Sequence, residues 1–311
     1  MSENIVETPA RPSAAPVRAR SGTADVLLAA VLWGTAGPVA TLAPQHTSAV
    51  AVSAVRVALG GLLLLAFAAT GPRRAGLAAL LRAGGRTRAV LAVGTVCAAA
   101  YQTAYYASVD RTGVAVSTVV ALGSAPAFAG LLQRRGLTRR WYTATATAVA
   151  GCALLVGAGP GAGAEPVGVA LALLCGFVYA LYSLAISRLV RTGAENSAVT
   201  GALFGGAALI MLPALAFARP GWALSGRGLA IALYLGAITI AVAYALFTRG
   251  LRGTPAATAM TLTLAEPAVA ALVGLAVLGE RLGGAAFAGI ALLGAALLVL
   301  AVPARRRSRA G

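Results

Sequence analysis

The chain has 311 residues, of which 59% are hydrophobic and 11% are charged. Soluble globular proteins carry about 25% charged residues, so this composition excludes an ordinary water-soluble fold. The formal net charge of +17 reflects 25 arginines, no lysine and eight acidic residues. Most of these arginines lie in short links between apolar runs, which is typical of a membrane orientation signal rather than of a nucleic-acid-binding surface.

Ten apolar runs bounded by Arg, Pro or Gly clusters follow one another along the chain. A helix needs about 20 such residues to cross a bilayer. In chain order the runs are 25–43, 49–70, 88–108, 113–132, 141–158, 166–187, 197–217, 227–247, 254–278 and 284–302. A β-barrel is excluded because its strands alternate apolar and polar residues, whereas these runs are apolar on every side. The predicted fold class is an all-α polytopic membrane protein with ten transmembrane helices.

The arginines also predict on which side of the membrane each segment lies. With a cytoplasmic N-terminus, the inside segments hold 20 arginines and the outside links hold four, so both termini are expected in the cytoplasm. Residues 1–21 are rich in Pro, Ala and Arg and are expected to be a disordered cytoplasmic tail, and residues 304–311 a basic one. A signal peptide cleaved near Ala43 is the alternative. The expected location is the inner or plasma membrane of the cell.

The two halves of the chain resemble each other. Aligning them so that Pro126, in ALGSAPAFAGLL, falls on Pro267, in TLTLAEPAVAAL, matches the surrounding runs, and a nearly equal offset sets GCALLVGA (151–158) beside GAALLVLA (294–301). The predicted repeats are 22–158 and 159–303, with five helices each. Because five is odd, the second repeat must enter the membrane from the opposite side, and inverted repeats are typical of carriers that alternate access around a central site.

Several stretches resemble a known family. They are LLAAVLWGTAGPVA (27–40), AVSAVRVALGGLLLL (51–65), YYASVDRTGVAVSTVVALGSAPAFAGLL (105–132) and AIALYLGAITIAVAYALFTRGLRGTPAATAMTLTLAEPAVAALVGLAVLGERL (230–282). In order and spacing they resemble the EamA-type transporters of the drug/metabolite transporter superfamily over nearly the whole chain. The resemblance implies transport of small metabolites, amino acids or drugs.

Two prolines occupy equivalent places inside apolar runs. Pro126 and Pro267 lack an N–H, so the carbonyl four residues earlier loses its helical partner. Paired helix breaks in the two halves of a carrier are typical of its central site, and Pro38 is a third candidate break. A simple packing kink is the alternative interpretation for each.

Two charged residues lie within the predicted spans. Glu266 is near the middle of the ninth span, where a lone charge costs about 2.5 to 3.5 kcal/mol, so it is a candidate for proton coupling and for the substrate cavity. The alternative is a structural carboxylate beside Pro267. The guanidinium of Arg56 is suited to bind a carboxylate, either that of Glu266 or that of an acidic substrate. The alternative is a structural role in which Arg56 joins two helices. Asp25, at the start of the first span, is expected to cap its helix.

Aromatic and amide side chains gather in three of the predicted spans. The candidates for the cavity are Trp33, Tyr101, Gln102, Tyr105, Tyr179 and Tyr182. Spacings of three or four residues place such groups on one helix face, where they could contact a flat or amphipathic solute. The alternative is the belt of Tyr and Trp that forms at the depth of the lipid headgroups.

The usual catalytic motifs are missing from the sequence. It holds no Walker-type loop, no zincin motif and only one histidine, so no enzyme, cofactor or metal site is predicted. The three cysteines, Cys97, Cys152 and Cys175, are expected to pack as small residues.

The predicted function is a secondary carrier that exports small organic solutes, with protons as the expected coupling ion. The predicted partners are the solute and the lipid bilayer, and no nucleic-acid partner is predicted. The sequence does not decide between a monomer and a homodimer. The alternative is a helical membrane subunit or membrane enzyme without transport activity.

Overall fold

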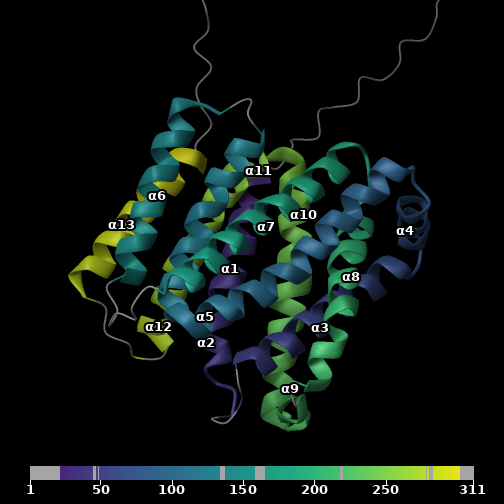
Figure 1. The fold of residues 1–311 in the computed structure, drawn as a ribbon, viewed down its shortest axis with the longest axis horizontal. Helices are drawn as coiled ribbons and strands as arrows, with labels where there is room; N and C mark the ends of the chain where they lie inside the picture. Colours follow the sequence, from purple (N-terminus) through teal and green to yellow (C-terminus); the bar gives the residue numbers. More distant parts are fainter. Residues whose placement is uncertain are drawn as a thin grey trace, which may run out of the picture.

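The computed structural model describes residues 22–301 except 45, 46, 48, 134–136, 158–164, 218, 219, 278 and 280–282, and the predicted tails 1–21 and 304–311 lie outside the described residues. Every regular element in this part of the chain is a helix, which confirms the all-α prediction. In chain order the helices are α1 Gly22–Gly34, α2 Ala36–Ala40, α3 Ala49–Ala69, α4 Arg73–Leu81, α5 Gly85–Gln133, α6 Arg139–Gly157, α7 Pro166–Arg191, α8 Asn196–Phe217, η1 Pro220–Leu224, α9 Gly226–Leu233, η2 Tyr234–Val242, α10 Ala243–Gly253, α11 Ala256–Thr263, α12 Ala265–Val277 and α13 Gly284–Ala301. Figure 1 shows them packed into one bundle.

Eight helical segments of the described chain are long and apolar enough to cross a membrane. Two of the ten predicted spans, 88–108 and 141–158, are not among them. The first forms the beginning of α5, where tyrosines and Gln102 lower the hydropathy, and the second is α6, which begins with two arginines and contains three threonines. The protein is therefore a multi-pass membrane protein in which eight crossings are supported by length and composition.

Gly113 divides α5 into two helices, close to the link predicted between the third and fourth spans. Its φ of 78° lies in the left-handed region, which costs residues with a side chain more than it costs glycine. The backbone on either side of Gly113 is helical. The two parts of α5 therefore correspond to two predicted spans.

The predicted helix breaks are only partly present. At Pro267 the chain is interrupted, because α11 ends at Thr263 and α12 begins at Ala265. At Pro126 the helix α5 continues without interruption, so the expected pair of breaks is absent on that side. A helix can keep its course past a single lost backbone bond when neighbouring groups compensate.

The helix contacts follow the pattern expected of two related halves. The most extensive contacts are those of α5 with α7, α3 with α8, α6 with α13 and α1 with α10. When Pro126 is aligned with Pro267, α1 corresponds to α7, and α10 corresponds to the first part of α5. The contact of α1 with α10 is thus the counterpart of the contact of α5 with α7, as an approximate twofold axis requires.

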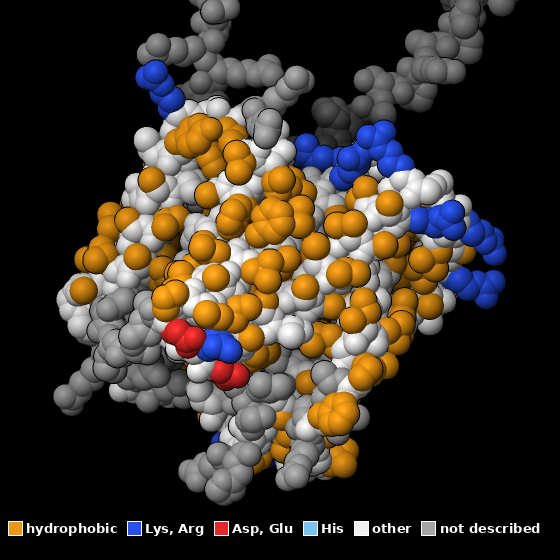
Figure 2. Space-filling model, in the orientation of Figure 1, with side chains coloured by type: hydrophobic (Ala, Val, Ile, Leu, Met, Phe, Trp, Pro, Cys, Tyr) orange, Lys and Arg blue, Asp and Glu red, His pale blue; other side chains and the backbone are white. Residues whose placement is uncertain are grey.

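The surface and the core differ as expected for a protein in lipid. Figure 2 shows hydrophobic side chains over most of the visible face and arginines along the upper edge and near α4. Large apolar side chains such as Leu131 and Leu298 are exposed on the surface of the protein. Their exposure is expected where the surface contacts lipid acyl chains rather than water. The cysteines Cys97, Cys152 and Cys175 are free and buried, as predicted.

Candidate functional site

Two helix interruptions lie side by side near the middle of the bundle. Helix α1 ends at Gly34 and α11 ends at Thr263, which precede Pro38 and Pro267 by four residues each. Each proline therefore removes the donor that would bind the carbonyl at the interruption. A Cβ placed on Gly34 would lie 2.7 Å from the backbone oxygen of Glu266, so glycine lets the two interrupted helices touch.

A third irregular segment, η2, adjoins these interruptions. It is a π-helix, a form that is rare and frequently found at functional sites. At its start the hydroxyl of Tyr234 is 2.9 Å from Thr35 Oγ1, and Thr35 is the residue between α1 and α2. Within η2, Thr239 donates to the carbonyl of Leu235 at 2.6 Å. Three departures from regular helix geometry are thus linked in one region.

Arg56 of α3 is bound to this irregular segment. Its Nε donates to Thr239 Oγ1 at 3.0 Å, across the interface between α3 and η2. The interface is close because a Cβ on Gly60 would lie 2.6 Å from the carbonyl oxygen of Gly236. Arg56 therefore ties together two helices from different halves of the chain, which is one of the two roles predicted for it.

Glu266 lies in the first turn of α12, beside the interruption at Leu264. A carboxylate at a helix N-terminus is stabilised by the helix dipole. Glu266 is half-buried, and among the described residues no hydrogen bond or ion pair of its side chain is found. The guanidinium of Arg56 donates instead to Thr239.

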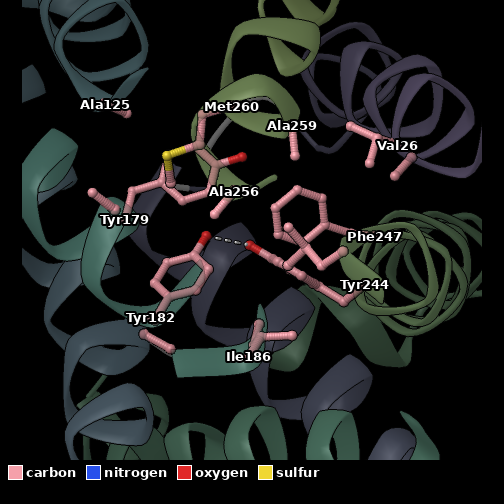
Figure 3. Close-up of a cluster of buried hydrophobic side chains, with 14 of the residues drawn as sticks. Val26, Ala125, Tyr179, Tyr182, Ile186, Tyr244, Phe247, Ala256, Ala259 and Met260 are labelled. Atoms are coloured by element: carbon pink, nitrogen blue, oxygen red, sulfur yellow. Dashed lines mark hydrogen bonds between the residues drawn. The ribbon is translucent and has the colours of Figure 1, made fainter. Parts of the chain in front are cut away.

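Seven aromatic side chains from five helices form a cluster next to the interruptions, which we call the aromatic cluster. Its members are Trp33, Tyr101, Tyr179, Tyr182, Phe204, Tyr244 and Phe247. Ring centroids are 4.9 Å apart for Trp33 and Tyr244, and 5.1 Å apart for Tyr179 and Tyr182. Figure 3 shows the hydroxyls of Tyr182 and Tyr244 pointing toward each other, at 3.3 Å.

One hydrogen bond joins the aromatic cluster to the interrupted helix. The hydroxyl of Tyr179 donates to Thr263 Oγ1 at 3.2 Å, and Thr263 donates in turn to the carbonyl of Met260 at 2.8 Å. Thr263 is the last residue of α11. The aromatic cluster is therefore hydrogen-bonded to the helix end that precedes Glu266.

A small cavity opens against the aromatic cluster. It is lined by aliphatic residues together with Tyr101, Gln102, Tyr182, Phe204 and Tyr244. Its size leaves room for about one water molecule, so the bundle is closed around its centre. The lining residues come from both halves of the chain, as expected of a site between two repeats.

The structure brings together most of the predicted cavity residues. Trp33, Tyr101, Tyr179 and Tyr182 belong to the aromatic cluster, and Gln102 lines the cavity. Tyr105 lies at the edge, because its ring stacks on Tyr101 at 6.1 Å while its hydroxyl pairs with Thr118 at 2.7 Å.

Of the predicted cavity residues, Tyr101, Gln102 and Tyr182 line the cavity. The others lie outside its lining: Trp33, Arg56, Tyr105, Tyr179 and Glu266. Phe204, Tyr244 and Phe247 were not anticipated from the sequence. The alignment that sets 151–158 beside 294–301 also sets Tyr101 on Tyr244, and this signal could have identified Tyr244.

Comparisons with known proteins agree with this arrangement. The EamA-like transporter family matches residues 21–157 and again residues 166–302. The chain is 36% identical to the uncharacterized transporter YwfM of Bacillus subtilis over 289 residues, which is 92% of this chain and 95% of that protein. It is 27% identical to the uncharacterized inner membrane transporter YicL of Salmonella typhimurium, over 94% of this chain and 98% of that one. A protein of known crystal structure is 22% identical and shares the fold, with a TM-score of 0.74 over 90% of this chain and 96% of that chain.

Proposed function

The chain belongs to the EamA-like transporter family, and on that premise we propose that it is a secondary active transporter that exports small organic solutes by alternating access. A membrane transporter is what the family and the named relatives have in common. The solute class, the outward direction and proton coupling are our proposals.

The observation that carries the proposal is the composition of the central cavity. Tyr101 and Gln102 come from the first half, whereas Tyr182, Phe204 and Tyr244 come from the second. A site built from both halves changes shape whenever the halves move relative to each other, which is the requirement for alternating access. The aromatic lining with few polar groups suits a flat or amphipathic organic solute.

The proposed architecture has ten transmembrane helices in two inverted repeats, 22–158 and 159–303. It is supported by the matching helix contacts of the two halves, because α1 packs against α10 in the same way as α7 packs against α5. Both termini are proposed to lie in the cytoplasm. This orientation is supported by Arg249, which lies beside Asp25 near the start of α1, because cytoplasmic links carry an excess of positive charge.

Glu266 is the proposed proton carrier. A carboxylate in the bilayer needs a compensating charge, water or a proton, and the side chain of Glu266 has neither an ion pair nor a hydrogen bond in the part of the chain that the structure describes. Its backbone contacts Gly34 at the paired interruptions, so protonation there can act on the packing of α1 against α12.

Flux in proteoliposomes tests the proposed function. The purified protein is reconstituted in liposomes that contain a pH-sensitive dye, and aromatic amines, amino acids and sugars are offered with and without an imposed pH gradient. A carrier gives saturable, gradient-dependent flux of at least one solute. Conductance without saturation would instead indicate a channel, and the absence of flux for the whole panel would favour a non-transporting subunit or an enzyme.

A further inference from the structure

Two ion pairs join the halves of the protein. In the first, Arg249 of α10 holds Asp25 of α1 with two bonds, from Nε at 2.7 Å and from Nη2 at 2.6 Å. In the second, Arg111 Nη1 of α5 lies 2.9 Å from Glu165 Oε1, at the start of α7. They are the two salt bridges found among the described residues. The sequence had suggested a capping role for Asp25, whereas the structure gives it an arginine partner.

The two ion pairs occupy similar places in the two repeats. Each connects the end of the third helix of one half to the start of the first helix of the other half. In the alignment that sets Pro126 on Pro267, Asp25 falls one position from Glu165, whereas Arg111 falls on Arg252, about one helical turn beyond Arg249. A twofold relationship between the repeats therefore brings one pair close to the position of the other, with the arginines offset by about one helical turn.

The pairs lie at opposite ends of helix α7. Glu165 directly precedes α7, whereas at its far end Arg191 donates to the carbonyl of Leu251, two residues after Arg249. Helix α7 has 26 residues and is therefore about 39 Å long, which exceeds the roughly 30 Å hydrocarbon thickness. One pair consequently closes each face of the membrane-spanning bundle.

A close approach at a glycine accompanies each pair. Beside Asp25, a Cβ on Gly250 would lie 2.7 Å from the carbonyl oxygen of Gly22. Beside Arg111, a Cβ on Gly168 would lie 2.9 Å from the Cβ of Arg111 itself. Both ends are thus tightly closed, with the water-sized cavity between them.

We propose that these two ion pairs are the gates of the transport cycle and that they break one at a time. The pair of Arg249 and Asp25 separates when the cavity opens toward the face where α1 begins. The pair of Arg111 and Glu165 separates when the cavity opens toward the opposite face. The inference rests on the proposed function. Because each pair links the two halves, tilting one half against the other must separate one pair while it preserves the other. Partly exposed ion pairs are weak enough to break and re-form in each cycle.

The gates are unequal in strength. The side chain of Asp25 is 12% exposed and receives two bonds, whereas Glu165 is 42% exposed and receives one. Bidentate bonds from arginine to a carboxylate are the stronger kind. The gate at the start of α1 is therefore the harder to open.

Cysteine accessibility tests this assignment without requiring a known solute. Ala98, which lines the cavity, is replaced by cysteine in a chain whose three native cysteines are changed to alanine. A membrane-impermeant maleimide is then added to sealed vesicles of either orientation. Neutralising one gate should raise labelling of the introduced thiol from that face and lower it from the other, by about two- to fivefold.

The variants are Asp25→Asn for one gate and Glu165→Gln for the other. The matched controls are Glu195→Gln, whose carboxylate bonds Ser197 within its own half, and Asp110→Asn, which neighbours Arg111 but makes no ion pair in the described chain. The controls should leave both labelling rates unchanged. Exchange of the charges in Asp25→Arg with Arg249→Asp should restore the original rates.

Opposite shifts for the two gate variants support the proposal. Equal shifts, shifts toward the same face, or equal effects of the controls overturn it. Transport is measured on the same variants, so that the gate hypothesis and the carrier hypothesis can be rejected independently of each other. Opposite labelling shifts without flux of any solute would reject the carrier and keep the gates, whereas flux without labelling shifts would reject the gates alone.

Discussion

The hydroxyl of Tyr179 donates to Thr263 Oγ1, so a residue of the aromatic cluster is hydrogen-bonded to the last residue before a helix interruption. Tyr179 belongs to α7 and Thr263 to α11, and the cavity lies beside the same cluster. In the proposed transport cycle, a solute in the cavity would act on this helix end through the aromatic cluster. This relationship gives the proposed coupling between solute and proton a physical route.

Replacing Tyr179 by phenylalanine should weaken transport without unfolding the protein. The variant loses one hydrogen bond, which contributes about 0.5 to 1.5 kcal/mol, while Thr263 keeps its bond to the Met260 carbonyl. We expect a melting temperature in detergent lower by a few degrees, and a larger relative loss of flux. Tyr142→Phe is the control, because that side chain is 58% exposed and lies far from the cluster in sequence. Equal flux in both variants would contradict the proposed route.

Replacing Gly34 by alanine should destabilise the contact between the interrupted helices at Gly34 and Glu266. The added Cβ would lie 2.6 Å from Val269 Cβ and 2.7 Å from the Glu266 oxygen, so α1 and α12 must separate. Overpacking of this kind costs about 1 to 3 kcal/mol. Thermal unfolding of the solubilised protein measures the loss.

Gly37→Ala is the matched control for Gly34→Ala. Gly37 lies about one turn further along the same span, and a Cβ there meets nothing within 4 Å. It should leave the unfolding temperature unchanged or raise it slightly, because alanine favours the helix. Equal destabilisation by the two substitutions would argue against close packing at Gly34.

Replacing Glu266 by glutamine should remove the dependence of flux on the pH gradient while leaving membrane insertion intact. Glutamine has nearly the same shape but cannot carry a proton away, and removal of the charge lowers the cost of insertion. Solute counterflow, which needs no net proton movement, should persist. Gradient-driven uptake and counterflow are measured on the same liposomes, with Glu195→Gln as control. Unchanged gradient dependence in Glu266→Gln would remove this residue from the coupling role.

Replacing Thr239 by valine should loosen the contact between α3 and η2. The hydroxyl accepts from Arg56 Nε and donates to the Leu235 carbonyl, and Thr239 is fully buried. Loss of a buried hydrogen-bond partner costs about 1 to 3 kcal/mol. Thr239→Ser keeps the hydroxyl and should retain most of the stability. The melting temperatures of the two variants are compared. Equal melting temperatures for the serine and valine variants would show that the hydroxyl of Thr239 does not contribute to stability.

The sequence alone determined the class of fold and the family. A bilayer requires long apolar helices with their backbone groups satisfied internally, so the runs, their lengths and the prolines within them are readable from local composition. The repeat, the aromatic candidates of the first and third spans and the isolated charge of Glu266 were visible in the same way. These features depend on residues that are neighbours in the chain.

The tertiary structure decided which of those residues meet. It interrupts the helix at Pro267 and keeps it continuous at Pro126, places Tyr244 against Trp33 across the bundle, and pairs Asp25 with Arg249. Contacts between residues so far apart in the chain depend on how the helices pack against each other. Close glycine contacts and hydrogen bonds between helices set that packing, and neither leaves a periodic pattern in the sequence.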